Sequence, residues 1–251
     1  MQIKTIVVTG AAGQLGTEIV RKYILEGYLV WCCDISESVM MDKFVQSDID
    51  INKIRMLAFD IGSPEQVKEA FNKIRSESSK IDILINNAAI AVFEPYFDRS
   101  FDDFMNVLRI NVGGTFLCIR EAVNMMDEKL GGSIVNIGSI YGVVSSNPAI
   151  YTDCNRFNSE VYSASKAAVI QMTKYFAVHC APKNIRVNCV SPGGVFNHQG
   201  SDFVSNYSKL TPVGRMATPQ EIVAGVFFMA SDQARYLTGH NLAIDGGFTS
   251  W

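Results

Sequence analysis

The 251-residue chain lacks several features that would assign it to a class of protein at once. It has 22 lysine and arginine residues against 25 aspartate and glutamate residues, so no basic excess marks a nucleic-acid-binding surface. Its three histidines are scattered, and its six cysteines include no CxxC pair, which argues against zinc sites and a disulfide framework. No apolar run could cross a membrane, and the amino terminus lacks a signal-peptide pattern. We expect a cytoplasmic protein that binds no metal, nucleic acid or membrane.

Short apolar runs alternate with amphipathic segments along the whole chain. Hydrophobic residues make up 48% of the sequence and charged residues 19%, enough apolar surface for a large core. Strand-like runs are expected at 3–8, 28–33, 55–59, 81–85, 133–138, 185–190 and 241–244. Strands separated by helices indicate a parallel sheet with helices on both faces, and no proline- or glycine-rich linker divides the chain. We therefore predict an α/β fold in one domain.

A glycine-rich turn separates the first expected strand from the helix that follows it. Its glycines are Gly10, Gly13 and Gly16. Gly10 permits a tight turn, Gly13 lets backbone N–H groups approach a pyrophosphate, and Gly16 lets the helix pack closely on the strand. The positive end of the helix dipole also favours bound negative charge. This arrangement is typical of a dinucleotide-binding unit.

Asp34 ends the second expected strand. A carboxylate at this position accepts hydrogen bonds from the adenosine ribose and repels a 2′-phosphate. Neither the glycine-rich turn nor the two residues after Asp34 supply a lysine or arginine to bind such a phosphate. The pattern predicts NAD rather than NADP as the cofactor. The alternative is that Asp34 only caps a loop.

Tyr162 and Lys166 are four residues apart, so on a helix they share one face. A neighbouring ammonium favours the phenolate and would lower the Tyr162 pKa from its usual value of about 10. Tyr162 is therefore a candidate general acid/base near neutral pH. An isolated pair of this kind is explained equally well by a surface helix, but the other motifs favour the catalytic interpretation.

Two further polar residues stand out by their position. Asn111 lies inside an expected helix from Phe101 to about Lys129, beside two glycines that are unfavourable there. Such a local conflict indicates a kink or a functional site. Ser139 follows the fifth expected strand, at the end where open α/β sheets bind ligands.

Together these segments make the sequence similar to the short-chain dehydrogenase/reductase family over nearly its whole length. The resemblance rests on the order and spacing of Thr9–Gly16, Asp60, Asn86-Asn87-Ala88, Asn111, Ser139, Tyr162 with Lys166, Pro192-Gly193, and the tail from Tyr236 to Gly247. It implies one doubly wound Rossmann domain over residues 1–251, with a parallel seven-stranded sheet. Two features depart from the usual pattern of the family's short members. The glycines of the turn follow a different spacing, and Ala89 stands where the family usually has a glycine.

The resemblance implies a catalytic set of Asn111, Ser139, Tyr162 and Lys166. Tyr162 would exchange a proton with the substrate oxygen, and Ser139 would hydrogen-bond the same oxygen. Lys166 would lower the Tyr162 pKa and bind the nicotinamide ribose, while Asn111 would hold a water that links Lys166 to solvent. The implied cofactor site comprises Gly10, Gly13, Gln14, Leu15, Gly16, Asp34, Asp60, Ile61, Asn87, Ala88, Tyr162, Lys166, Pro192, Gly193 and Val195.

The segment 145–158 lengthens the stretch between Ser139 and Tyr162 relative to other short family members, so we expect it to border the substrate. It is rich in polar residues, which suit a hydroxylated or anionic ligand better than an apolar one. Tyr151 and Arg156 within it, with Ser139 and His198, are the candidate substrate residues; a polar surface loop and a surface histidine are the alternatives. The segment also resembles family members associated with bacterial surface-sugar biosynthesis, such as flagellin-glycan nonulosonate pathways.

The predicted function is an NAD-dependent oxidoreductase that interconverts a polar alcohol and a ketone, with a sugar derivative as the favoured small-molecule substrate. A 3-oxoacyl reductase and a non-catalytic NAD-binding regulatory module are the alternatives. The family resemblance further implies a homo-oligomer, either a tetramer or a dimer.

Overall fold

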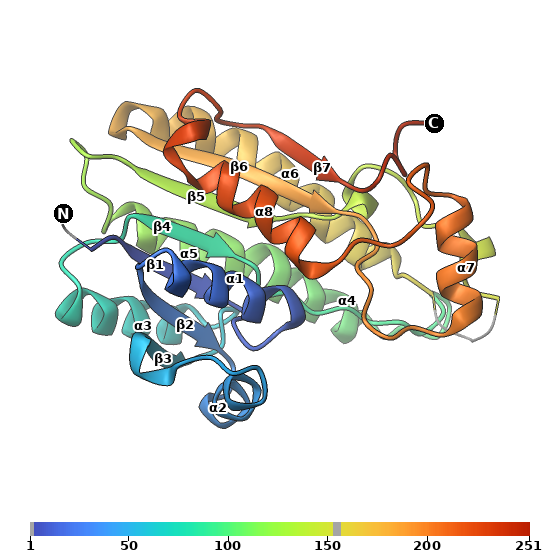
Figure 1. Ribbon diagram of the computed structural model, residues 1–251, viewed down its shortest axis with the longest axis horizontal. Coiled ribbons are helices and arrows are strands. Elements are labelled where there is room, and N and C mark those ends of the chain that lie inside the picture. Colours follow the sequence, from blue (N-terminus) through green and yellow to red (C-terminus); the bar gives the residue numbers. More distant parts are fainter. Residues whose placement is uncertain (1–2, 153–156) are drawn as a thin grey trace.

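The computed structural model describes residues 3–152 and 157–251. Its centre is a seven-stranded sheet in the order β3-β2-β1-β4-β5-β6-β7 (Figure 1). Every neighbouring pair of strands is parallel. The strands are β1 Thr5–Thr9, β2 Leu29–Asp34, β3 Ile54–Ala58, β4 Ile83–Asn86, β5 Gly132–Ile137, β6 Ile185–Pro192 and β7 Asn241–Ile244. The predicted α/β fold with a parallel seven-stranded sheet is confirmed.

Helices cover both faces of the sheet because side chains alternate between the faces along each strand. Ile6 and Val8 join the core beneath α1, α2 and α8, whereas Val7 joins the core beneath α3, α5 and α6. Figure 1 looks onto the face that α1 and α8 cover. The helices are α1 Gln14–Leu25, α2 Glu37–Gln46, α3 Pro64–Glu77, α4 Phe101–Leu108, α5 Thr115–Val123, α6 Glu160–Cys180, α7 Ser201–Lys209 and α8 Pro219–Ala230. Within the described part of the chain, none of them has the length and hydropathy needed to span a bilayer.

Most helices begin at a residue whose side chain accepts a hydrogen bond from the first turn. These caps are Ser36, Ser63, Ser100, Ser159 and Thr218, at the starts of α2, α3, α4, α6 and α8. Each such cap typically stabilises a helix by about 1 kcal/mol. Helix α1 differs, because Gly13 precedes it and provides no side-chain cap. The backbone N–H groups of its first turn are therefore left for another partner.

The helix expected from Phe101 to about Lys129 is interrupted and shorter, so that prediction was wrong in part. Helix α4 ends at Leu108, a π-helical turn η2 spans Arg109–Gly114, and α5 ends at Val123. The π turn contains Asn111 and both glycines that the sequence marked as a conflict. Such turns inside α-helices occur frequently at functional sites, and the side-chain contacts of Asn111 give the local reason.

Helix α7 lies at the end of the sheet toward which β5, β6 and β7 point, apart from the helices that cover the two faces (Figure 1). Beneath it is a third apolar cluster, formed by Ile140, Ile150, Tyr207, Met216 and Phe248. This cluster joins the loops after β5, β6 and β7 into one body. It therefore builds a wall at the carboxyl edge of the sheet.

Candidate active site

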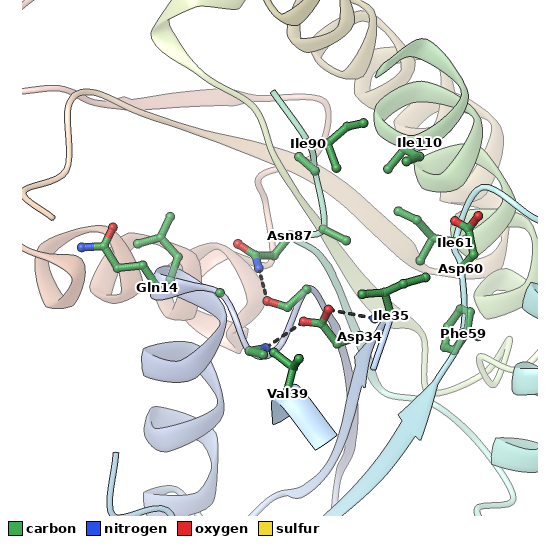
Figure 2. A pocket seen from close by; sticks show the side chains of 16 residues that line it. Gln14, Asp34, Ile35, Val39, Phe59, Asp60, Ile61, Asn87, Ile90 and Ile110 are labelled. Atoms are coloured by element: carbon green, nitrogen blue, oxygen red, sulfur yellow. Dashed lines mark hydrogen bonds between the residues drawn. The ribbon is translucent and has the colours of Figure 1, made fainter. Parts of the chain in front are cut away.

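A cavity of about 570 Å³ opens at the carboxyl ends of β1 to β4. Figure 2 shows Asp34 from the end of β2, Phe59 and Asp60 from the end of β3, and Asn87 from the end of β4 around it. Strand β1 lies between β2 and β4, so the chain reverses its direction across the sheet at this point. Ligands of open α/β sheets bind at such a switch point. The volume also lies within the range of about 300–1,000 Å³ that small-molecule sites occupy.

The glycine-rich turn forms one wall of this cavity, as predicted. Gly10, Gly13, Gln14 and Leu15 line it, while Gly16 packs against the turn behind them. Gly10 has a φ of +63°, and a Cβ at Gly16 would lie 2.0 Å from the Gly10 carbonyl oxygen, so larger side chains do not fit. The uncapped N-terminus of α1 adjoins the same space. Free N–H groups at a helix N-terminus fit a pyrophosphate.

Asp34 is held by two backbone groups at the edge of this turn. Its Oδ2 accepts from the Ala12 N–H at 2.9 Å and its Oδ1 from the Ile35 N–H at 2.8 Å (Figure 2). The adjoining lining residues Ile35 and Val39 are apolar. Among the described residues that line the cavity there is no lysine or arginine. The site therefore presents a carboxylate, without a balancing cation, where a ribose would bind.

The other predicted cofactor residues lie at the far side of the cavity. Asp60, Ile61, Asn87 and Ala88 all line it, and the Asn87 amide donates to the Gly10 carbonyl at 2.8 Å. Asp60 also pairs with Arg109 at 2.8 Å. The sequence analysis missed the apolar part of the lining, which is Ile35, Val39, Phe59, Ile90 and Ile110. The only sequence feature that could have identified these residues is that they lie close in the chain to the motif residues named above.

Ser139 and Tyr162 meet at the carboxyl end of β5. Their side chains lie close enough for the Ser139 hydroxyl to act on the Tyr162 pKa, although 22 residues separate them in the chain. Tyr162 lies in the first turn of α6, whose start is set by the Ser159 cap. Both residues line a second cavity of about 220 Å³. The structure thus brings the predicted proton-transfer residue and its hydroxyl partner together at one surface.

The Tyr162 pKa, which the sequence analysis expects to be lowered, is raised in the structure. Burial is the cause, and the nearby Ser139 hydroxyl offsets it only in part. The Lys166 ammonium lies over the Tyr162 ring, 5.6 Å from its centroid, and donates to the Ile137 carbonyl at 2.7 Å. Burial lowers the pKa of Lys166 itself to about 8. The Tyr162 hydroxyl therefore keeps its proton at neutral pH, which is the form that donates to a ketone.

Asn111 holds protein groups rather than only the water that the family resemblance implied. Its Oδ1 accepts from the Ile90 N–H at 2.8 Å, and its Nδ2 donates to the Ile90 carbonyl at 2.9 Å and to the Ser165 hydroxyl at 3.0 Å. The side chain is almost fully buried. Asn111 thus ties the loop after β4 to α6 within one turn of Lys166.

Substitution Asn111→Ala is expected to destabilise the protein by about 2–4 kcal/mol, because it leaves the Ile90 N–H and carbonyl without their partners. Urea denaturation followed by circular dichroism measures the loss. The matched control is Asn106→Ala, at an exposed position on the preceding helix, with an expected loss below about 0.5 kcal/mol. Equal losses of unfolding free energy in the two variants would show that the hydrogen bonds of Asn111 do not stabilise the protein.

The second cavity contains most of the remaining predicted residues. Pro192, Gly193 and Val195 line it together with Tyr151, Ser139 and Tyr162. His198 is exposed, makes an edge-to-face contact with Phe196, and does not line this cavity; its neighbour Gln199 does. Arg156 lies outside the described residues. Residues that the sequence analysis missed are Phe93, Tyr141, Phe203, Tyr207 and Met216, of which only Tyr141 carries a sequence signal, two positions after Ser139. Asn158, from the segment 145–158 that was expected to border the substrate, also lines the cavity.

Comparison with known proteins gives consistent matches over nearly the whole chain. A family model described as enoyl-(acyl carrier protein) reductase matches residues 10–249. An NAD-dependent glycerol dehydrogenase from Listeria innocua is 33% identical, with coverage of 98% of this chain and 94% of the relative. A 3-oxoacyl-[acyl-carrier-protein] reductase from Thermotoga maritima is 31% identical, with 97% of each protein covered.

Solved structures give the same assignment. A short-chain dehydrogenase from Leptospira borgpetersenii with bound NAD⁺ is 41% identical, covers 99% of this chain and 94% of its own, and has a TM-score of 0.89. The structure of ElxO with bound NADP is 27% identical, covers both chains completely, and has a TM-score of 0.88. The family model's match, residues 10–249, includes the glycine-rich turn, Ser139, Tyr162 and Lys166 of this chain. The protein is therefore an oxidoreductase that belongs to the short-chain dehydrogenase/reductase family.

Proposed function

We propose that this oxidoreductase uses NAD(H) to interconvert a small polar alcohol and the corresponding ketone, with Tyr162 as the general acid/base. The observation that carries the proposal is that Ser139 and Tyr162 line the same 220 Å³ cavity, with the Lys166 ammonium over the Tyr162 ring. Ile90 lines the larger cavity and its neighbour Ala91 the smaller one, so the two spaces adjoin. A dinucleotide in the first would thus present its nicotinamide end to a substrate in the second.

The chain's own residues would bind the cofactor, orient the substrate and donate a proton to its oxygen. The α1 N-terminus and the glycine-rich turn would hold the pyrophosphate, Asp34 the ribose, and the loop from Pro192 the nicotinamide end. The bound nicotinamide supplies or accepts the hydride. Ser139 would hydrogen-bond the substrate carbonyl and stabilise charge that develops on its oxygen. Tyr162 donates its proton to that oxygen, and Lys166, over the ring, stabilises the phenolate left behind.

NAD is favoured over NADP because of the surroundings of Asp34. A 2′-phosphate would meet this carboxylate beside the apolar Ile35 and Val39. Like charges at such a short distance disfavour binding strongly. Two of the similar proteins bear NAD in their descriptions and one was solved with NADP, so the chain's own residues supply the stronger argument.

We expect kcat/KM for NADH to exceed that for NADPH by at least about tenfold, because Asp34 repels the 2′-phosphate. Steady-state rates with a reducible ketone measure the ratio. Asp34→Ser should lower the ratio, whereas Asp42→Ser, at an exposed position on α2, should leave it unchanged. A wild-type preference for NADPH would refute the cofactor assignment.

A second candidate function is reduction of a 3-oxoacyl thioester, favoured by the Thermotoga maritima relative; the description of the family model shares only the acyl carrier protein. Acyl-carrier substrates would require basic surface near the entrance. No lysine or arginine is found among the described lining residues of either cavity. Comparison of acetoacetyl thioester with small free ketones as substrates distinguishes the two functions.

We also propose that the chain is one domain, works as a homo-oligomer and resides in the cytoplasm. Aromatic and aliphatic side chains on α5 and α6 support association, since Phe116 is 41%, Tyr175 58% and Val178 71% exposed. Five cysteines of the described residues are buried and free, which suits a reducing compartment. Light scattering coupled to gel filtration measures the oligomeric state, and a monomeric mass would exclude association.

A further inference from the structure

A side-chain hydrogen bond joins the glycine-rich turn to the loop that follows β6. The Gln14 Nε2 donates to the Phe196 carbonyl at 2.6 Å, although 182 positions separate the two residues in the chain. Gln14 is the first residue of α1 and lines the 570 Å³ cavity. Phe196 directly follows Val195, which lines the 220 Å³ cavity. The contact therefore links the walls of the two cavities.

The contact reaches across the carboxyl edge of the sheet. Strands β1 and β6 are separated by β4 and β5, and three strand spacings of about 4.8 Å place them roughly 14 Å apart. The loop from Pro192 must therefore run back along this edge to meet the turn that follows β1. A dinucleotide that reaches from the turn to the second cavity lies along the same edge, so its nicotinamide half lies against this loop.

Hydrogen bonds on both sides of Phe196 hold the loop together. The Phe196 N–H donates to the Ala217 carbonyl at 2.8 Å. The Gln199 side chain accepts from the Asn197 N–H at 2.7 Å and donates to the Val195 carbonyl at 2.9 Å. Val195 and Gln199 also line the 220 Å³ cavity. A change in the position of Phe196 would therefore move the wall of the cavity that contains Tyr162.

The contact requires a side chain with an N–H donor, and the spacing of the glycines in the turn provides one. Glycines stand at positions 10, 13 and 16, which leaves position 14 for a longer residue. Figure 2 shows the Gln14 amide directed away from Asp34 and Asn87, so it is placed to act on the loop rather than on the adenosine end of the site. The hydrogen bond is exposed to solvent, so water can replace it while the cofactor enters.

We propose that Gln14 is a positioning residue that holds the loop after β6 closed over the nicotinamide half of the bound dinucleotide. This inference rests on the proposed function, since it requires a dinucleotide that extends across both cavities. The Gln14–Phe196 hydrogen bond must open before the cofactor leaves, so it slows release of the cofactor. Through Val195 and Gln199 it also keeps the wall of the substrate cavity in place.

The test measures the dissociation rate of NADH by stopped-flow fluorescence, with excess NAD⁺ added to prevent rebinding. Gln14→Met keeps the length of the side chain but removes its donor, and should raise the rate by about fivefold, the effect of one lost hydrogen bond. The matched control is Gln220→Met, at an exposed glutamine whose amide donates to Glu18 at 3.1 Å and joins α8 to α1. It should keep the wild-type rate, because its contact does not involve the loop.

A second ligand separates this role from a direct contact between Gln14 and the pyrophosphate. ADP has the adenosine and the pyrophosphate but no nicotinamide, so its Kd, measured by calorimetry, should be the same in Gln14→Met and in the wild type. An unchanged NADH dissociation rate in Gln14→Met, an equal rise in Gln220→Met, or fivefold weaker binding of ADP to Gln14→Met would overturn the proposal and leave the proposed function intact. Only a wild type that fails to bind NADH, or full activity of a Tyr162→Phe variant, would remove the proposed function itself.

Discussion

Substitution Tyr162→Phe is expected to lower kcat by about a thousandfold or more, since a positioned general acid contributes about 10²–10⁴ to the rate. Phenylalanine preserves the ring beneath the Lys166 ammonium but has no proton to donate to the substrate oxygen. Because the hydroxyl acts only in the transition state, kcat and kcat/KM should fall together. Steady-state reduction of a ketone with NADH measures both.

Binding of NADH should change little in this variant, because the glycine-rich turn and Asp34 line a separate part of the site. Fluorescence titration with NADH tests this point. The matched control is Tyr236→Phe, at a fully exposed tyrosine, which should retain full turnover. A Tyr162→Phe variant with wild-type turnover would show that another group donates the proton, or that the chain only binds the dinucleotide, the regulatory alternative.

Substitution Lys166→Met is expected to abolish most activity and at the same time stabilise the free protein. Proton donation leaves a buried phenolate at Tyr162, and loss of the ammonium over its ring should lower kcat by about a hundredfold or more. The stability gain follows from burial, which lowers the Lys166 pKa from 10.5 to about 8. Even after loss of the hydrogen bond to Ile137, the gain should be about 2 kcal/mol, a rise of about 4–8 °C in Tm.

The pH dependence of stability separates the cost of burying the Lys166 ammonium from other effects of the substitution. In the unfolded chain Lys166 loses its proton near 10.5 and in the folded protein near 8, so the unfolded state binds more protons between these values. Stability of the wild type relative to Lys166→Met is therefore lowest below pH 8 and rises as the pH increases toward 10.5. Comparison with Lys174→Met, at an exposed position on the same helix, gives the baseline. A Lys166→Met variant less stable than the wild type at pH 7 would contradict the burial argument.

Much of the cofactor site could be predicted from local sequence. The glycine-rich turn between β1 and α1 and the acid at the end of β2 are set by neighbouring residues. Strand positions followed from apolar runs, because strands buried on both faces need apolar side chains throughout. The helix through Asn111 was predicted too long, and although the sequence indicated a kink or a functional site there, no propensity scale contains the contacts that its side chain makes with Ile90.

The sequence by itself predicted the parallel sheet, the glycine-rich turn and the candidate proton-transfer residues, because each depends on periodicity or on short, ordered spacing. Tertiary structure decided the rest. It buried Lys166 against the Ile137 carbonyl and raised rather than lowered the Tyr162 pKa. These properties depend on which distant groups exclude water from a side chain, and that is known only when the chain is folded.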